Sequence, residues 1–311
     1  MLRKVALFCL ATSVMLGACS PPLASPPTFS VPASQPEAVD TDQPGTGDQP
    51  AARIVSLAPS NTEILFAVGA GSQLVGRDSF SDYPPEALGV ADVGGGFMVL
   101  NMEVIVSERP DIILASPLTP PEQLADLEQV GLNVQVVPNP RTFEELYSNL
   151  EWVAQLTGHE AQGAALIAAL RGRVEAVTSK VAGAARSPLV YYELDATDPN
   201  APYTSGPGTF VQLLIESAGG VNFGAQMDSE WVQVSVESLL ARQPDMIILG
   251  DYTYGGVTPD QVRARAGWDA LSAVQQDQMY TFDDNLVSRP GPRLVDGLEA
   301  MARLLHPDLA W

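Results

Sequence analysis

The stretch NMEVIVSERPDIILA at residues 101–115 recurs in altered form as SVESLLARQPDMIILG at residues 235–250. Each copy opens with a residue type favoured at helix N-termini, and a glutamate, Glu103 or Glu237, follows two residues later. A Pro-Asp pair and a continuous apolar run come seven residues after that glutamate. Such a run is typical of a strand buried on both faces of a parallel sheet. The repeat therefore predicts two lobes of related topology.

Short apolar runs also occur outside this repeat, and they alternate with stretches of helical character. This alternation is typical of α/β folds with mostly parallel central sheets. In the first such unit Ser60 and Glu63 have the spacing of a capping box, which predicts that a helix begins there, and Gly69 is of a type that often ends one. The predicted strands are residues 53–57, 74–76, 111–115 and 133–137 in the first half, and residues 189–194, 245–249 and 279–282 in the second.

One long helix is predicted between the two halves. Apolar residues recur there at spacings of three and four, which gives a helix a single apolar stripe. A long helix that joins two α/β lobes would be stiff, and the space between such lobes is the usual place for a ligand. We expect a first lobe at residues 52–157, the helix at 158–184 and a second lobe at 185–311. The stripe consists of Ile167, Leu170, Val174, Val177 and Val181.

The N-terminus has the features of an export signal. Arg3 and Lys4 precede an apolar stretch at residues 5–16, which is too short to span a bilayer. The following LGAC ends at Cys19 and resembles the lipobox of bacterial lipoproteins, in which the cysteine receives a lipid. We therefore expect a signal peptide at residues 1–18 and a lipidated Cys19. Residues 19–51, rich in proline and serine, are expected to be a disordered tether.

Composition limits the classes of function that need to be considered. The formal net charge of -21 disfavours nucleic acid as a partner. Only His159 and His306 are present, so a histidine-rich metal site is not expected. Motifs of serine hydrolases, phosphate-binding loops and dinucleotide-binding folds are missing from the sequence. We expect no catalytic residues and no cofactor, and an exported hydrolase that uses dispersed carboxylates is the remote alternative.

Several segments, in their order and spacing, resemble the iron-siderophore and vitamin B12 binding family of ABC importers. The SDYPP segment and the Trp-x-x-Val-Ser approach to Glu237 look most like the cobalamin-binding members. The resemblance implies two α/β lobes joined by one backbone helix, and it implies an extracytoplasmic, lipid-anchored monomer that serves an ABC permease dimer and its ATPase. The segments are RIVSLAPSNTEILFAVG (53–69), SFSDYPPEA (79–87), NMEVIVSERPDIILAS (101–116), PYTSGPGTF (202–210), SAGGVNFG (217–224) and WVQVSVESLLARQPDMIIL (231–249).

The resemblance also gives the repeated glutamates a role. In the family one glutamate on each lobe docks with arginines of the permease, and Glu103 and Glu237 match those positions. Bidentate pairing of carboxylates with arginines would fix the orientation of docking. The alternative is that each glutamate only complements the dipole of its helix. The two roles are compatible.

A bulky, nearly neutral macrocycle would need aromatic walls and a few polar groups. Aromatic residues placed between predicted elements are candidates, although each taken singly is also compatible with core packing. Two arginines are candidate cations of the cleft, and a solvated surface position is the alternative for each. Three ligand classes remain open: a corrinoid, a ferric siderophore, or haem with Tyr83 or Tyr252 as axial ligand. The candidate ligand residues are Tyr83, Phe97, Tyr203, Trp231, Tyr252, Tyr254, Arg77 and Arg289.

Overall fold

The structure is a computed structural model that describes residues 50–96 and 98–311. The described residues belong to one compact unit. The predicted signal peptide, Cys19 and nearly all of the predicted tether lie outside the described residues, as does Phe97.

The strands of the described residues are short, and each strand predicted from the sequence is present. Two sheets contain only parallel strands, and a third is a small antiparallel pair. The predicted α/β class with mostly parallel sheets is therefore confirmed. The strands are β1 (Ile54–Ser56), β2 (Leu74–Arg77), β3 (Ala91–Asp92), β4 (Ile112–Ala115), β5 (Val134–Val136), β6 (Leu189–Glu193), β7 (Tyr203–Ser205), β8 (Val221–Asn222), β9 (Trp231–Gln233), β10 (Met246–Leu249) and β11 (Met279–Thr281).

The order of strands divides the described chain into two lobes. The first lobe contains a five-stranded sheet in the order β3-β2-β1-β4-β5. The second contains a four-stranded sheet in the order β11-β10-β6-β8, together with the pair β7-β9. The helices are α1 (Pro59–Ala67), α2 (Met102–Glu108), α3 (Pro121–Gln129), α4 (Phe143–Thr157), α5 (Glu160–Val181), α6 (Phe210–Ser217), α7 (Val236–Arg242), α8 (Tyr252–Gly255), α9 (Pro259–Arg263), α10 (Ser272–Gln275) and α11 (Leu294–Leu305).

The two copies of the sequence repeat, residues 101–115 and 235–250, have similar helix ends and similar hydrogen bonds. The helices α2 and α7 each end at a residue in the left-handed conformation, Arg109 with φ 48° and Gln243 with φ 49°. The Asp111 carboxylate then accepts bonds from the amides of Ala52 and Arg53, and the Asp245 carboxylate accepts one from the amide of Leu189. Each Pro-Asp aspartate thus ties its own strand to the start of the neighbouring central strand, β1 or β6.

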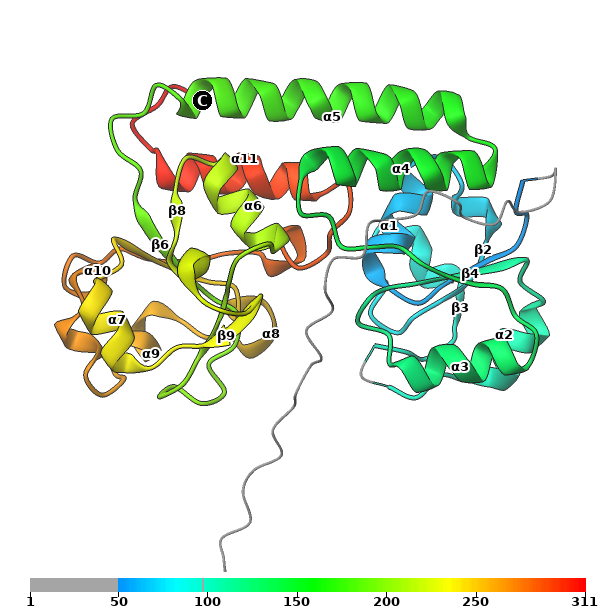
Figure 1. Cartoon of the computed structure of the whole chain (residues 1–311), viewed down its shortest axis with the longest axis horizontal. Coiled ribbons are helices and arrows are strands. Elements are labelled where there is room, and N and C mark those ends of the chain that lie inside the picture. The colour runs from blue at the N-terminus through cyan, green and yellow to red at the C-terminus, as the bar shows by residue number, and fades with distance from the viewer. Residues whose placement is uncertain (1–49, 97) are drawn as a thin grey trace, which may run out of the picture. The chain divides into compact units, whose positions relative to one another are not determined.

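The helix α5 is the long backbone helix that the apolar stripe predicted. Leu170, Val177 and Val181 of the stripe are buried, while Ile167 and Val174 are partly buried. Two further helices, α4 from the first lobe and α11 from the second, run alongside α5 (Figure 1). Because both lobes contribute a helix to this layer, α5 is braced along its length.

A single hydrophobic cluster extends through this helical layer from one parallel sheet to the other. It includes Ile54 and Leu114 of the first sheet, Leu170 of α5, Leu298 of α11 and Ile248 of the second sheet. The opposite face of each sheet packs into a separate cluster of its own lobe. The lobes are thus joined by packed side chains as well as by the chain itself.

The predicted capping box at Ser60 and Glu63 is wrong. The helix α1 begins at Pro59, and its N-cap, Ala58, makes no side-chain capping bond. Proline at the first helical position already has a helical φ, and the N-cap lies two residues earlier than predicted, at Ala58 instead of Ser60. Glu63 is buried inside the helix and pairs with Arg293. Gly69, with φ 96°, follows the end of the helix as predicted.

Candidate ligand site

The aromatic residues predicted for the ligand site are exposed, in contrast to the aromatic residues of the core. Tyr191, Tyr192 and Trp268 are fully buried at 0% exposure. The five predicted aromatics that the structure describes range in exposure from 37% to 65%. Core packing therefore does not account for them, and exposed aromatic faces are suited to contact with a flat, apolar ligand. They are Tyr83, Tyr203, Trp231, Tyr252 and Tyr254.

Tyr252 and Tyr254 lie on α8, directly beyond the carboxyl end of β10. A pocket of about 450 Å³ opens there between the ends of β10 and β11. Ligands of open parallel sheets bind at the carboxyl ends of the strands, so the position is a favourable one. Besides Tyr252, the pocket is lined by Thr253, Gly256, Thr281, Phe282 and Asp283.

Tyr203 and Trp231 belong to the small antiparallel pair of the second lobe. Tyr203 pairs with Gln233 and Trp231 with Ser205, so the two aromatics lie diagonally across neighbouring strands. Trp231 also packs on Phe210, with ring centroids 5.7 Å apart. One side of the indole is thereby supported while 37% of the residue stays exposed.

Tyr83 lies in the loop after β2, in the first lobe, and contacts an arginine of the second. The guanidinium carbon of Arg293 lies 4.0 Å from the Tyr83 ring centroid, within the range of a cation–π contact. In the same region Nη1 of Arg289 lies 2.5 Å from Oδ1 of Asp82. The structure thus brings the predicted Tyr83 and Arg289 into one cluster that connects the lobes.

Each arginine of this cluster has a carboxylate partner. Glu63 accepts hydrogen bonds from Nε and Nη2 of Arg293, and its Oε1 lies 3.5 Å from Nη1 of Arg289. Burial raises the pKa of Glu63, and the two arginines oppose that shift. Burial also acts to raise the pKa of Asp82, but Arg289 outweighs it, so this pKa is lowered. Two carboxylates therefore face two guanidinium groups, and Arg289 itself is only 7% exposed.

Arg77, the other predicted cation, is occupied within the first lobe. It is 8% exposed, and its guanidinium donates to the carbonyl oxygens of Ala87 and Asp78. Its Nη1 also lies 3.6 Å from a carboxylate oxygen of Asp92. These contacts fix the loop that carries Tyr83, and a role of Arg77 in ligand binding stays a prediction.

Glu103 and Glu237 lie on different lobes, at the second positions of α2 and α7, and both are exposed. Asn101 and Ser235 cap these helices by accepting bonds from the amides of Val104 and Ser238. A backbone hydrogen bond and the Ser235 hydroxyl lower the pKa of Glu237. Both glutamates are therefore available for contact with another protein.

Three features of the site region were missed from the sequence. Phe80 is a further exposed aromatic, and its place in the SFSDYPP segment was a usable signal. The ion pair of Glu63 was missed because the spacing of Glu63 from Ser60 matches that of a capping box. The third is a buried cluster beneath α8, in which Arg265 donates to both carboxylate oxygens of Glu193 at 2.6 and 2.8 Å. Burial, reinforced by Glu193, raises the pKa of the adjacent Asp251 to about 8.

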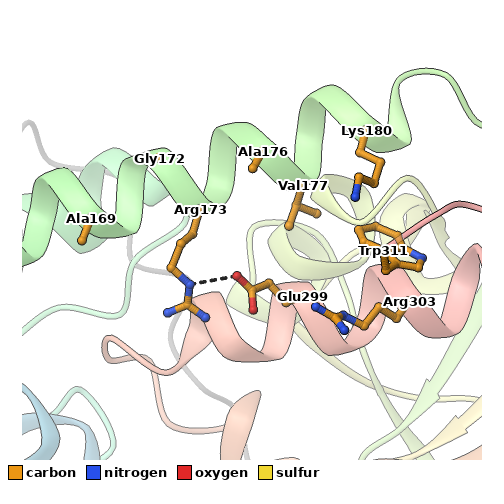
Figure 2. Close-up of a pocket in the computed structure, with 9 residues that line it drawn as sticks. All are labelled: Ala169, Gly172, Arg173, Ala176, Val177, Lys180, Glu299, Arg303 and Trp311. Carbon is orange, nitrogen blue, oxygen red and sulfur yellow. Dashed lines mark hydrogen bonds and ion pairs between the residues drawn. The ribbon is translucent and has the colours of Figure 1, made fainter.

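A second pocket, of about 330 Å³, lies on the helical layer instead of the sheet edges. Figure 2 shows it between α5 and α11, with Lys180 and Arg303 on either side of Trp311. The Lys180 ammonium lies 4.8 Å from the Trp311 ring centroid. None of the predicted ligand residues lines this pocket. Within residues 50–96 and 98–311, no helix combines the length and apolar character needed to span a membrane.

The two parallel sheets, the long helix and the exposed aromatics define a two-lobed binding protein. The chain belongs to the periplasmic binding protein family, whose pattern matches residues 54–286. This confirms the expected family and indicates a binding protein that works outside the cytoplasm, in a family that is not a class of enzymes.

Individual relatives are similar over most of their length. The ABC transporter substrate-binding lipoprotein YvrC of Bacillus subtilis is 32% identical over 261 residues, which cover 82% of this chain and 80% of the relative. The crystal structure of the periplasmic vitamin B12 binding protein BtuF of Vibrio cholerae is 31% identical with a TM-score of 0.72, and covers 83% of this chain and 98% of its own. The apo form of the periplasmic heme-binding protein RhuT from Roseiflexus has 28% identity and a TM-score of 0.73, with coverage of 83% and 98%.

Proposed function

We propose that the protein captures a corrinoid between its lobes and delivers it to an ABC importer. Its partners would be the permease dimer and the ATPase of that importer. The similarity to the vitamin B12 binding protein of Vibrio cholerae supports this ligand class, and the similarity to YvrC supports the transport role.

The observation that carries the proposal is the combination of exposed aromatics with neutralised arginines. Arg289 and Arg293 are both paired with carboxylates of the chain, Asp82 and Glu63. An anionic ligand would have to displace one of these carboxylates, which costs the interaction that it replaces. A nearly neutral macrocycle would not, and it would gain from contact with the aromatic faces. A corrinoid fits this description better than an anionic ferric siderophore.

Haem is the second candidate. The similarity to the heme-binding protein RhuT favours it, and Tyr252, which is 47% exposed at the mouth of the pocket, is a candidate axial ligand. The propionates of haem would still meet arginines that are already paired. We therefore rank haem below a corrinoid.

The surface glutamates and the N-terminus complete the proposal. Glu103 and Glu237 would each meet arginines of the permease, one from each lobe. Cys19 would carry the lipid that holds the protein at the membrane, and residues 19–51 would be the tether. The protein would act as a monomer whose lobes span residues 52–157 and 185–311, on either side of the helix at 158–184.

An absorption experiment tests the ligand class. The full chain, purified in mild detergent, is incubated separately with cyanocobalamin, haemin and a ferric siderophore, and each sample is then desalted. We expect the cyanocobalamin spectrum to remain with the protein at a ratio near one to one. Retention of haemin or the siderophore alone would overturn the corrinoid assignment in favour of that ligand.

A further inference from the structure

The segment at residues 288–293, just before α11, reaches from the second lobe to the first. It places Arg289 against Asp82 and Arg293 against Glu63, and Glu63 is the most deeply buried of the four side chains at 1% exposure. The Arg293 side chain contacts two other side chains. Its guanidinium nitrogens bond to Glu63, and its guanidinium face covers the ring of Tyr83.

The bond between Glu63 and Arg293 fixes the orientation of the guanidinium group. Nε of Arg293 lies 2.9 Å from Oε2 of Glu63, and Nη2 lies 2.5 Å from Oε1. Two parallel bonds hold a planar guanidinium in the plane of its carboxylate partner, which a single bond would not do. The face that Arg293 turns toward Tyr83 is therefore set by Glu63.

The surrounding backbone leaves this arrangement little freedom. A Cβ at Gly291 would lie 3.3 Å from the carbonyl oxygen of Ser60 and 3.8 Å from Cβ of Glu63. The segment at residues 288–293 thus packs closely on α1, because glycine permits that approach. On the other side Pro84 and Pro85 follow Tyr83 and restrict the backbone that carries the ring.

We propose that Glu63 is a positioning residue of the ligand site, which acts through Arg293 to hold the ring of Tyr83 in a fixed orientation. Tyr83 remains 44% exposed, so one face of the ring is supported and surface is left for the ligand. A ring that is ordered before binding loses less rotational freedom when the ligand arrives. The inference rests on the proposed function, since it needs Tyr83 to contact the ligand.

A double-mutant cycle in the full chain tests this coupling. Dissociation constants for cyanocobalamin are measured for wild type, Glu63→Gln, Tyr83→Ala and the double variant. We expect Glu63→Gln to weaken binding roughly two- to tenfold in the wild-type background. The same change should have no effect when Tyr83 is already alanine. The matched control is Glu299→Gln, which breaks the 2.8 Å pair with Arg173 on the helical layer and should leave affinity unchanged.

A ligand-free measurement separates this inference from the proposed function. In protein labelled with 3-fluorotyrosine, the ¹⁹F resonance of Tyr83 is assigned by its loss in Tyr83→Phe. Glu63→Gln and Arg293→Met should both move this resonance, and Glu299→Gln should not. If Glu63→Gln does not fold, Glu63→Met combined with Arg293→Met removes both charges together and tests the same resonance.

An unmoved Tyr83 resonance, or a loss of affinity that persists in the Tyr83→Ala background, would overturn the positioning role. Absence of cyanocobalamin binding by wild type, with a Tyr83 resonance that moves as expected, would instead contradict the proposed ligand and establish the coupling of Glu63 to Tyr83.

Discussion

Nη2 of Arg141, in the first lobe, lies 2.6 Å from Oε1 of Glu230 in the second. This ion pair is exposed, with 60% and 46% of the two side chains accessible, whereas the pair of Glu63 and Arg293 is buried. The two pairs are therefore expected to differ greatly in their effect on stability. Exposed pairs are weakened by solvent and salt, while a buried charge that loses its partner is costly.

We predict that Glu230→Gln lowers the free energy of unfolding by less than about 1 kcal/mol. Glu63→Gln should lower it by about 3–5 kcal/mol, because Arg293 keeps a buried charge without its carboxylate. Urea denaturation of both variants and wild type, followed by circular dichroism, measures the difference. Equal losses in the two variants would contradict this reading of the pairs.

Affinity for the ligand should depend on where an exposed aromatic side chain lies, and not only on how much of its area is exposed. Trp231 and Trp311 provide a matched comparison, since each is 37% exposed. Trp231 belongs to the proposed ligand site, and Trp311 lines the pocket on the helical layer (Figure 2). We expect Trp231→Ala to weaken cyanocobalamin binding about tenfold or more, and Trp311→Ala to leave it unchanged. Isothermal titration calorimetry gives both values.

Charge reversal at the repeated glutamates should separate transport from binding. Glu103→Lys with Glu237→Lys is expected to abolish uptake of labelled corrinoid, because the two proposed contacts with arginines of a permease would become repulsive. Affinity for the ligand should stay within a factor of two. The control is Glu128→Lys with Glu216→Lys, which changes the same amount of charge at exposed positions of α3 and α6. Loss of ligand binding in the first variant would count against the docking role.

Stability should depend on pH through Asp251. Its pKa in the folded protein, about 8, is raised by burial above the ordinary value of 3.8, so the folded state holds a proton that the unfolded state releases. Its contribution to stability therefore falls as the pH rises from about 4 to about 8 and levels off above that. Asp251→Asn imitates the protonated acid and should remove this fall.

Urea denaturation at pH 5, 6.5 and 8 tests the role of Asp251. The variant should gain stability relative to wild type as the pH rises, and the gain should be greatest at pH 8. The titratable groups that interact with Asp251 are Glu193, Arg265, Tyr191 and Tyr192, of which burial keeps the two tyrosines neutral. A constant difference between variant and wild type at the three pH values would show that Asp251 does not hold the proton.

Domain motion on binding should be small. The hydrophobic cluster that includes Ile54, Leu170 and Ile248 continues from the first sheet through α5 to the second. Closure by a large rotation would have to separate these packed side chains, which costs free energy for the apolar area exposed. We expect the radius of gyration from small-angle scattering to be the same with and without ligand, within error. A decrease typical of hinged closure would refute the expectation.

Most of the fold could be predicted from local sequence because its signals are local. The apolar runs of β4 and β10 and the N-caps of α2 and α7 depend on neighbouring residues, and each appears where predicted. Tyr252 and Tyr254 follow the carboxyl end of β10, as the sequence indicated, whereas Tyr203 and Trp231 lie within β7 and β9, a strand pair that was not predicted.

The contacts between the lobes could not be predicted in the same way. The partner of Glu63 is 230 residues away, so nothing near Glu63 distinguishes a buried ion pair from a capping box. Arg77 and Arg289 also look alike in sequence, yet one is bonded within the first lobe and the other reaches across to Asp82. Such pairings depend on how the lobes are packed, which no short segment encodes.

The shared core also bears on how cargo would leave. Because packed apolar side chains join the two lobes, the protein has no stable open conformation to which it can return on its own. Release of the ligand would then require work done by a transporter that contacts both lobes at once. The free energy needed to separate the lobes would be supplied by the transporter and not by the ligand.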